Sequence, residues 1–324
     1  MMHNLKDFLE TYEVDQTQSL DPKHQGSIYQ ATNKATETTW ALKWAELHPR
    51  FDKGVLTNRY EKAQELSHLN LLPYHQNFRF EEGSTIVELA LLPIVTRKSL
   101  AQATGLNTEE KYAITEQVLD GLYYLHGHGV IWQNLSASHI LLEESFGNLI
   151  PKFINYGNQE RIPLPFFSDY EYLAPEQFKT NSNVTEQTDI WAYGVLLHQL
   201  WTGRLPFGEK SASLPNAKIQ ARITGEEDWA LGLLPTIPMP YRLLVEKCLK
   251  KNQEERWENC GQIIAALKKW ENTPDKDILI AEKNVLEEEE KRERRFLRRP
   301  SRPINWWVVL ILLGLAVALG RWLG

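Results

Sequence analysis

The sequence has 324 residues, of which 42% are hydrophobic, 10% are aromatic and 24% are charged, and its net charge is −6. The ordinary apolar fraction excludes a wholly disordered chain, and 18 glycines and 16 prolines exclude a collagen-like fibre. The two cysteines, Cys248 and Cys260, are too few for a disulfide framework or a cysteine zinc site. An acidic body with one short basic segment is not typical of a nucleic-acid-binding protein.

The first ninety residues predict a sheet with one helix. Residues 38–44 are rich in strand-forming side chains around Lys43, and residues 85–91 form an apolar run typical of a buried strand. Residues 52–66 have the apolar spacing of a helix. This part of the chain is therefore expected to be a small, strand-rich lobe.

The chain from about residue 95 onward predicts mainly helices. Residues 109–126 are strongly amphipathic. Residues 187–201 are apolar on nearly all sides, which is typical of a central buried helix. A strand-rich lobe followed by a larger helical lobe indicates a two-lobed α+β fold.

Residues 271–303 predict a charged linker that includes a basic juxtamembrane helix. Residues 272–275 interrupt the preceding helix, and acidic side chains then precede basic ones by four positions, which favours a solvated helix. A stiff spacer fits this pattern better than a coiled coil, because no apolar heptad is sustained.

Residues 304–324 predict a transmembrane anchor. The apolar run Trp306–Leu323 has 18 residues, or roughly 27 Å of helix against a hydrocarbon core of about 30 Å. Tryptophans lie at both ends, and seven basic residues and one acid form a basic collar at Lys291–Arg302. The expected topology is a single-pass membrane protein with a large cytoplasmic N-terminal domain. The alternative is a buried core helix.

The order of several motifs resembles the eukaryotic-type protein kinase family. Trp40-Ala41-Leu42-Lys43 is similar to the family's VAIK strand, Ala174-Pro175-Glu176 to its APE motif, and Asp189-Ile190-Trp191 to the start of its helix αF. The resemblance covers about residues 12–270. It implies a kinase-like domain at 1–270, with an N-lobe at about 12–92 and a C-lobe at about 93–270.

The resemblance also implies roles for individual residues. Lys43 would pair with nucleotide phosphates, Gly26 would be the last glycine of the phosphate loop, and an adenine would lie between three apolar side chains (Ile28, Ala41 and Leu141). Glu176 is expected to form a buried ion pair with Arg256, and Asp189 is expected to have a structural role. Trp132 and Tyr156 take positions where the family packs its two lobes together.

The catalytic positions depart from the family pattern. Asn134 replaces the catalytic aspartate, Ser136 the phosphate-steadying lysine, and His139 the metal-binding asparagine. Asn155 stands in place of the magnesium-binding aspartate. An amide cannot take up the substrate proton, and magnesium prefers carboxylate oxygens, so both the base and the metal ligands are weakened.

These observations favour a membrane-tethered pseudokinase that acts as a signalling scaffold or allosteric partner for unidentified proteins. We expect no metal and no required cofactor, although ATP binding without magnesium is compatible with the sequence. One alternative is a divergent Ser/Thr kinase that uses Lys43, with Asn134 or a displaced acid orienting the substrate. The other is a nucleotide sensor that closes on ATP without metal.

Overall fold

The structure is a computed structural model. It describes residues 4–16, 27–47, 55–94, 98–157, 161, 162, 164, 167–180, 183–225, 234 and 236–271. The chain divides into two compact units, Met1–Lys269 and Trp270–Gly324, and nearly all described residues belong to the first.

The predicted linker at 271–303 and the predicted anchor at 304–324 lie outside the described residues, apart from Glu271. Among the residues that the structure does describe, no helix has the length and apolar character needed to cross a membrane.

The N-lobe is a five-stranded antiparallel sheet with the strand order β1-β2-β3-β5-β4. Its strands are β1 (Tyr12–Asp15), β2 (Ser27–Asn33), β3 (Thr39–Leu47), β4 (Gln76–Glu82) and β5 (Thr85–Leu92). The predicted strands at 38–44 and 85–91 correspond to β3 and β5, and the predicted helix at 52–66 corresponds to α2 (Val55–Gln64). The predicted strand-rich lobe is therefore confirmed.

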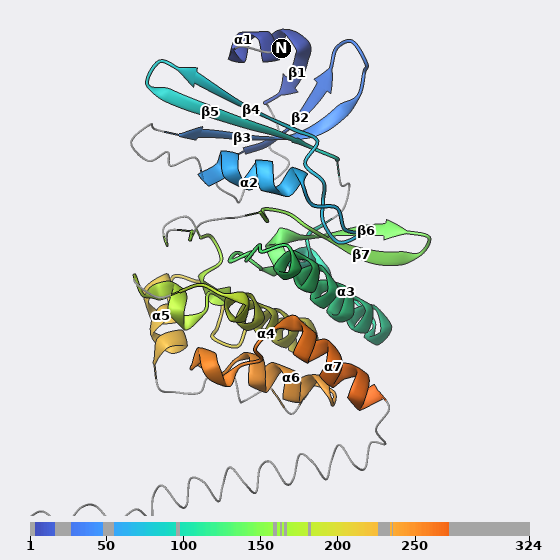
Figure 1. The fold of residues 1–324 in the computed structure, drawn as a ribbon, viewed down its shortest axis with the longest axis vertical. Coiled ribbons are helices and arrows are strands. Elements are labelled where there is room, and N and C mark those ends of the chain that lie inside the picture. Colours follow the sequence, from blue (N-terminus) through green and yellow to red (C-terminus); the bar gives the residue numbers. More distant parts are fainter. Residues whose placement is uncertain are drawn as a thin grey trace, which may run out of the picture. The chain divides into compact units, whose positions relative to one another are not determined.

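A short helix that the sequence analysis did not predict, α1 (Leu5–Thr11), covers the sheet on the side away from α2 (Figure 1). Its Phe8 is fully buried and stacks on Tyr12 with ring centroids 4.7 Å apart. Phe78 and Phe80 of β4 pack against the same ring. The helix thus buries a face of the sheet that would otherwise expose aromatic side chains to water.

The C-lobe is mainly helical and carries one two-stranded sheet. Its helices and strands are η1 (Leu100–Gln102), α3 (Thr108–Gly127), η2 (Ala137–His139), β6 (Ile140–Ser145), β7 (Asn148–Phe153), η4 (Tyr170–Tyr172), η5 (Pro175–Phe178), α4 (Glu186–Thr202), α5 (Asn216–Thr224), α6 (Tyr241–Cys248), η7 (Gln253–Glu255) and α7 (Cys260–Glu271). This arrangement confirms the two-lobed α+β fold.

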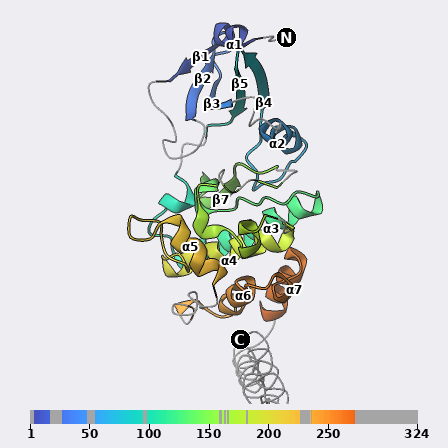
Figure 2. The same ribbon diagram turned by 90° about the vertical axis from the view of Figure 1, so that its left-hand side faces the viewer.

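Helix α4 lies at the centre of the C-lobe, as predicted for residues 187–201. Every residue from Thr188 to His198 is buried. The helix packs against α3 and α6, as the two ribbon views show (Figures 1 and 2). At Gly194 an added Cβ would lie 2.5 Å from the Cβ of Cys248, so only glycine permits this close approach of α6.

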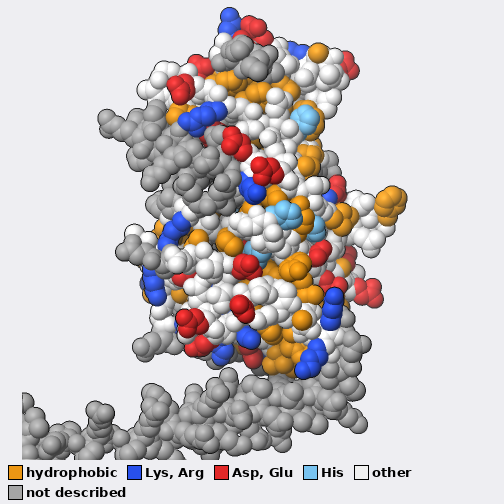
Figure 3. Space-filling model, in the orientation of Figure 1, with side chains coloured by type: hydrophobic (Ala, Val, Ile, Leu, Met, Phe, Trp, Pro, Cys, Tyr) orange, Lys and Arg blue, Asp and Glu red, His pale blue; other side chains and the backbone are white. Residues whose placement is uncertain are grey.

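The surface of the described residues carries charges of both signs. On the face shown in Figure 3, acidic and basic side chains are interspersed over the two lobes. Large exposed apolar side chains are few and scattered, and Phe146 at the tip of the β6–β7 hairpin is the most exposed of them. Single exposed apolar residues of this kind are normal on a folded domain.

Candidate functional site

Lys43 is held inside the molecule by strand β3. It lies between Ile28 of β2 and Ala90 of β5 in the sheet, and only 8% of the residue is exposed. Its ammonium group donates a hydrogen bond to Oδ1 of Asn155, which follows β7 in the C-lobe. The lysine that resembles a phosphate-binding group therefore contacts a neutral amide from the other lobe.

Asn155 is fixed by its own backbone. Its φ angle is 60°, in the left-handed region that asparagine tolerates better than most residues. Its N–H donates to the hydroxyl of Tyr74 at 3.2 Å, and its carbonyl accepts from Nε1 of Trp132 at 3.2 Å. These contacts hold the amide in place opposite Lys43.

Asp189, for which only a structural role was expected, supports the loop that begins at Trp132. Its carboxylate is fully buried at the start of α4 and accepts the backbone N–H groups of Trp132 and Gln133, both at 2.7 Å. Gln133 has a φ of 62°, so this turn needs a local support. The fixed carboxylate provides it from the rigid central helix.

His126 of α3 shares the same carboxylate. Its Nε2 lies 2.9 Å from Asp189, and its Nδ1 lies 3.5 Å from both Glu186 and Cys260. Burial disfavours the charged ring, but the hydrogen bonds to Asp189, Cys260 and Glu186 together raise the pKa of His126 to about 12. The loop therefore rests on a buried imidazolium–carboxylate pair.

The loop itself contains three of the substituted positions. The Nδ1–H group of His139 is directed to the backbone carbonyl of Asn134 at 2.7 Å and to Oγ of Ser136 at 3.2 Å. A carbonyl oxygen can only accept, so Nδ1 carries the proton. His139 is 2% exposed and is engaged within the loop.

Asp169 brings a carboxylate to this loop, which the sequence analysis did not identify. Its Oδ2 accepts hydrogen bonds from Oγ of Ser136 at 2.6 Å and from Oγ of Ser138 at 3.0 Å. The residue directly precedes η4. The sequence does show this acidic residue seven positions before Glu176, which could have identified Asp169 as a candidate.

Tyr156 packs the two lobes together, in agreement with the role expected for it, whereas Trp132 stacks on Phe153 within the C-lobe at 4.5 Å. Both residues are fully buried, and the hydroxyl of Tyr156 donates to the carbonyl of Leu72 at 2.8 Å. Its ring lies 5.7 Å from that of Tyr74, which in turn lies 5.1 Å from Tyr60 of α2. Burial raises the pKa of Tyr156, so its hydroxyl keeps the proton that it donates.

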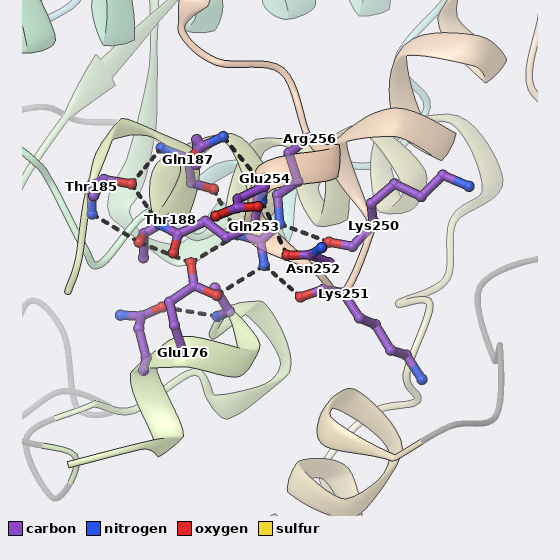
Figure 4. Close-up of polar contacts among 12 residues, drawn as sticks. Glu176, Thr185, Gln187, Thr188, Lys250, Lys251, Asn252, Gln253, Glu254 and Arg256 are labelled. Atoms are coloured by element: carbon purple, nitrogen blue, oxygen red, sulfur yellow. Dashed lines mark hydrogen bonds and ion pairs between the residues drawn. The ribbon is translucent and has the colours of Figure 1, made fainter. Parts of the chain in front are cut away.

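The ion pair expected between Glu176 and Arg256 is present (Figure 4). The two guanidinium nitrogens lie 2.8 and 2.9 Å from the two carboxylate oxygens, which is a bidentate geometry. Thr188 of α4 donates to the same carboxylate at 3.0 Å. Arg256 also donates to the carbonyls of Gln187 and Lys250, so the pair ties η5, α4 and the segment before η7 together.

Two of the three residues expected to hold an adenine lie on neighbouring strands, and the third lies in the C-lobe. Ile28 and Ala41 lie on the neighbouring strands β2 and β3, and Leu141 lies on β6, each half-buried. Gly26 lies outside the described residues. Glu61 of α2, the acid nearest to the position expected to partner Lys43, is exposed. Within the described ranges, no group of three histidine, cysteine, aspartate or glutamate side chains has the arrangement of a metal site.

Comparison with known proteins gives consistent matches. Residues 24–268 match the family model of the protein kinase domain. The chain is 29% identical to myosin light chain kinase 3 of Homo sapiens over 220 residues, which are 63% of this chain and 26% of that protein. It is 24% identical to serine/threonine-protein kinase PknH of Mycobacterium bovis over 262 residues, which are 78% of this chain and 43% of that protein.

A third relative is the probable serine/threonine-protein kinase PknB of Lactococcus lactis, with 26% identity over 208 residues, 62% of this chain and 32% of that protein. The similarity thus spans less than half the length of each of these relatives.

Proposed function

Since this chain belongs to the protein kinase domain family, we propose that it is a pseudokinase, a kinase-like module that binds other proteins without transferring phosphate. It serves as a scaffold or allosteric partner in signalling and is tethered to a membrane. The observation that carries the proposal is the contact between Lys43 and the neutral amide of Asn155, at the point where the family has a metal-binding carboxylate.

The loss of metal ligands supports this function. Magnesium is held in such sites by one or two carboxylates, and phosphoryl transfer depends on the metal to neutralise charge. Asn155 offers only an amide oxygen, which already accepts from Lys43. At the second metal position His139 offers an imidazole, which suits softer metals than magnesium, so both metal positions differ from the family pattern.

The base position supports it as well. An amide at Asn134 cannot accept the proton of a substrate hydroxyl. A carboxylate at the loop, that of Asp169, accepts two short hydrogen bonds from Ser136 and Ser138. Its oxygen is thus occupied in holding the segment before η4 against the loop.

A nucleotide sensor is the second candidate, and the position of Lys43 favours it. The ammonium is buried, and Asn155, its partner, is fixed by Tyr74 and Trp132. A phosphate group that displaced the amide would gain a full ionic contact without any metal. A divergent kinase would additionally need Asp169 to give up its hydrogen bonds with Ser136 and Ser138 and to act as the base.

A thermal-shift titration of the purified protein with ATP, with and without magnesium or manganese, separates these functions. The scaffold function predicts no change in melting temperature, and the sensor function predicts a rise that does not depend on metal. A metal-dependent rise together with incorporation of labelled γ-phosphate, both abolished by Lys43→Met, would show an active kinase and overturn the proposal.

The membrane tether is supported by sequence alone, through the apolar run Trp306–Leu323 and the basic collar Lys291–Arg302. A collar of this kind places the kinase-like domain on the cytoplasmic side. Deletion of residues 304–324 is expected to move the protein from the membrane pellet to the soluble fraction. Unchanged pelleting of the deletion variant would argue against an anchor.

A further inference from the structure

A cavity of about 420 Å³ lies in the C-lobe, next to the loop described above. Its walls come from η1 and the segment that follows, from the first turns of α3, from the start of η2 and from the last turns of α4. This volume is within the range of known ligand sites. None of the roles discussed so far involves it.

The cavity has an apolar floor and an open mouth. Leu100, Ala137 and Leu196 are buried side chains of the floor, with exposed fractions of 7%, 2% and 1%. Ala101 and Gly203 belong to the wall and are exposed. The hollow therefore opens at the surface, where a side chain of another protein can enter and be removed from water.

One side of the cavity is cationic. Among the lining residues that the structure describes, Lys111 of α3 is the only charged one. Its ammonium lies 5.6 Å from the ring centre of Trp201, and none of the residues described by the structure forms an ion pair with it. The neighbouring carboxylate of Glu110 is used to cap the helix, since it accepts the N–H of Asn107 at 2.8 Å.

The other polar side chain among the described lining residues is that of Gln199. Its Oε1 accepts the hydroxyl hydrogen of Tyr172, and its N–H groups can donate to a ligand. The described part of the lining thus combines leucine and alanine surface with a lysine and an amide donor, without an acidic side chain. Such a set favours an apolar group that lies next to a carboxylate and disfavours a cation.

We propose that this cavity is the docking site for an acidic, leucine-containing segment of a partner protein. A leucine side chain fills the apolar floor, and an adjacent glutamate or aspartate pairs with Lys111. The inference rests on the proposed scaffold function and names the chemistry of the partner. Through Gln199 and Tyr172 the occupied cavity contacts the segment that precedes Glu176.

Fluorescence anisotropy with the full-length protein tests the proposal. The probe is a fluorescein-labelled, amidated peptide, Gly-Glu-Leu-Leu-Glu-Gly, and the comparison peptides carry Gln for Glu, Lys for Glu, or Ser for Leu. The Glu-Leu-Leu-Glu peptide is expected to bind most tightly. The peptide contains no serine, threonine or tyrosine, so its binding is independent of any phosphoryl transfer and can be judged even if the pseudokinase proposal fails.

Two variants locate the binding. Lys111→Met is expected to weaken binding of the acidic peptide about fivefold, by loss of one partly exposed ionic contact, and to leave the Gln peptide unchanged. Ala101→Trp, which blocks the mouth, is expected to abolish binding of both. Lys6→Met, at an exposed lysine of α1, is the matched control and is expected to change nothing.

Several results would overturn the proposal: no binding of the acidic peptide, equal binding of the Lys peptide, or binding that neither Lys111→Met nor Ala101→Trp affects. Displacement of the peptide by a lower concentration of decanoate would also overturn it, because the preferred occupant would then be a free acyl anion.

Discussion

The network around Arg256 and the site around Lys43 belong to one fold, but they differ in the groups that they place together. Around Arg256 a full positive charge meets a full negative charge in a bidentate pair, with Thr188 and backbone carbonyls completing the hydrogen bonds. At Lys43 a full positive charge meets the amide of Asn155. Charge pairing is retained in the first region and reduced in the second.

The difference indicates which charges the architecture needs. The buried carboxylates of Glu176 and Asp189 each hold separate chain segments together, and neither lies where a substrate or metal would react. The positions that would serve phosphoryl transfer are amides, a serine and a protonated imidazole nitrogen. The proposed pseudokinase function implies a fold that has lost its chemistry and kept its shape, and the following predictions test each half of that proposal.

The largest effect is expected from Arg256→Met. The substitution leaves the carboxylate of Glu176 buried without its cation, and broken buried pairs of this kind cost about 3–5 kcal/mol in the free energy of unfolding. Urea unfolding followed by fluorescence measures the loss. Arg204→Met, at an exposed arginine, is the control and is expected to change the unfolding free energy by less than about 0.5 kcal/mol. A loss below about 1 kcal/mol for Arg256→Met would contradict a supporting role.

A pH-dependent effect of intermediate size is expected from His126. Its pKa rises from 6.5 to about 12 on folding, because the hydrogen bonds to Asp189, Cys260 and Glu186 outweigh the cost of burial. The stability that the charged ring contributes is complete below pH 6.5 and is lost as the pH rises toward 12. The stability advantage of the wild type over His126→Gln should fall by about 1 kcal/mol per pH unit above 6.5.

Urea unfolding of both proteins at pH 6.5, 7.5 and 8.5 measures this slope. A stability advantage that stays constant over the three pH values would show that the ring of His126 is neutral in the folded protein. The loop would then be supported by a hydrogen bond between a neutral His126 and the carboxylate of Asp189.

Sequence patterns predicted the supports better than the site. The apolar run at 187–201 was enough to predict the central helix, because a sequence displays burial patterns directly. The resemblance to the kinase family implied the ion pair of Glu176 with Arg256 and a structural role for Asp189. Helix α1 was not predicted because it has only seven residues. The burial of its Phe8 can be recognised only when the sheet on which it packs is known.

The contacts within the site could not be read in the same way. Asp169 and Ser136 are 33 positions apart, and Lys43 and Asn155 are 112 positions apart. No local pattern marks such pairs, since their meeting depends on how the loops fold back on α4. The sequence also could not show which ring nitrogen of His139 carries the proton, because the carbonyl of Asn134 determines this.

The smallest effect on stability, and the most direct test of the site, is expected from Asn155→Asp. The change restores a carboxylate opposite Lys43 at almost equal side-chain volume, so the unfolding free energy should change by less than about 1 kcal/mol. A carboxylate oxygen is a hard ligand that magnesium prefers to an amide. The variant is therefore expected to gain a magnesium-dependent rise in melting temperature with ATP, of about 3 °C, that the wild type lacks.

Phosphate transfer should remain absent in the Asn155→Asp variant, because the base position is still the amide of Asn134. Asn148→Asp, at an exposed position of β7, adds the same charge away from Lys43 and is expected to gain no metal dependence. If wild type and variant responded equally to magnesium and ATP, the amide at position 155 would not be what limits metal binding. The limit on metal binding would then lie in the phosphate loop or at His139, because these hold the remaining metal and phosphate positions.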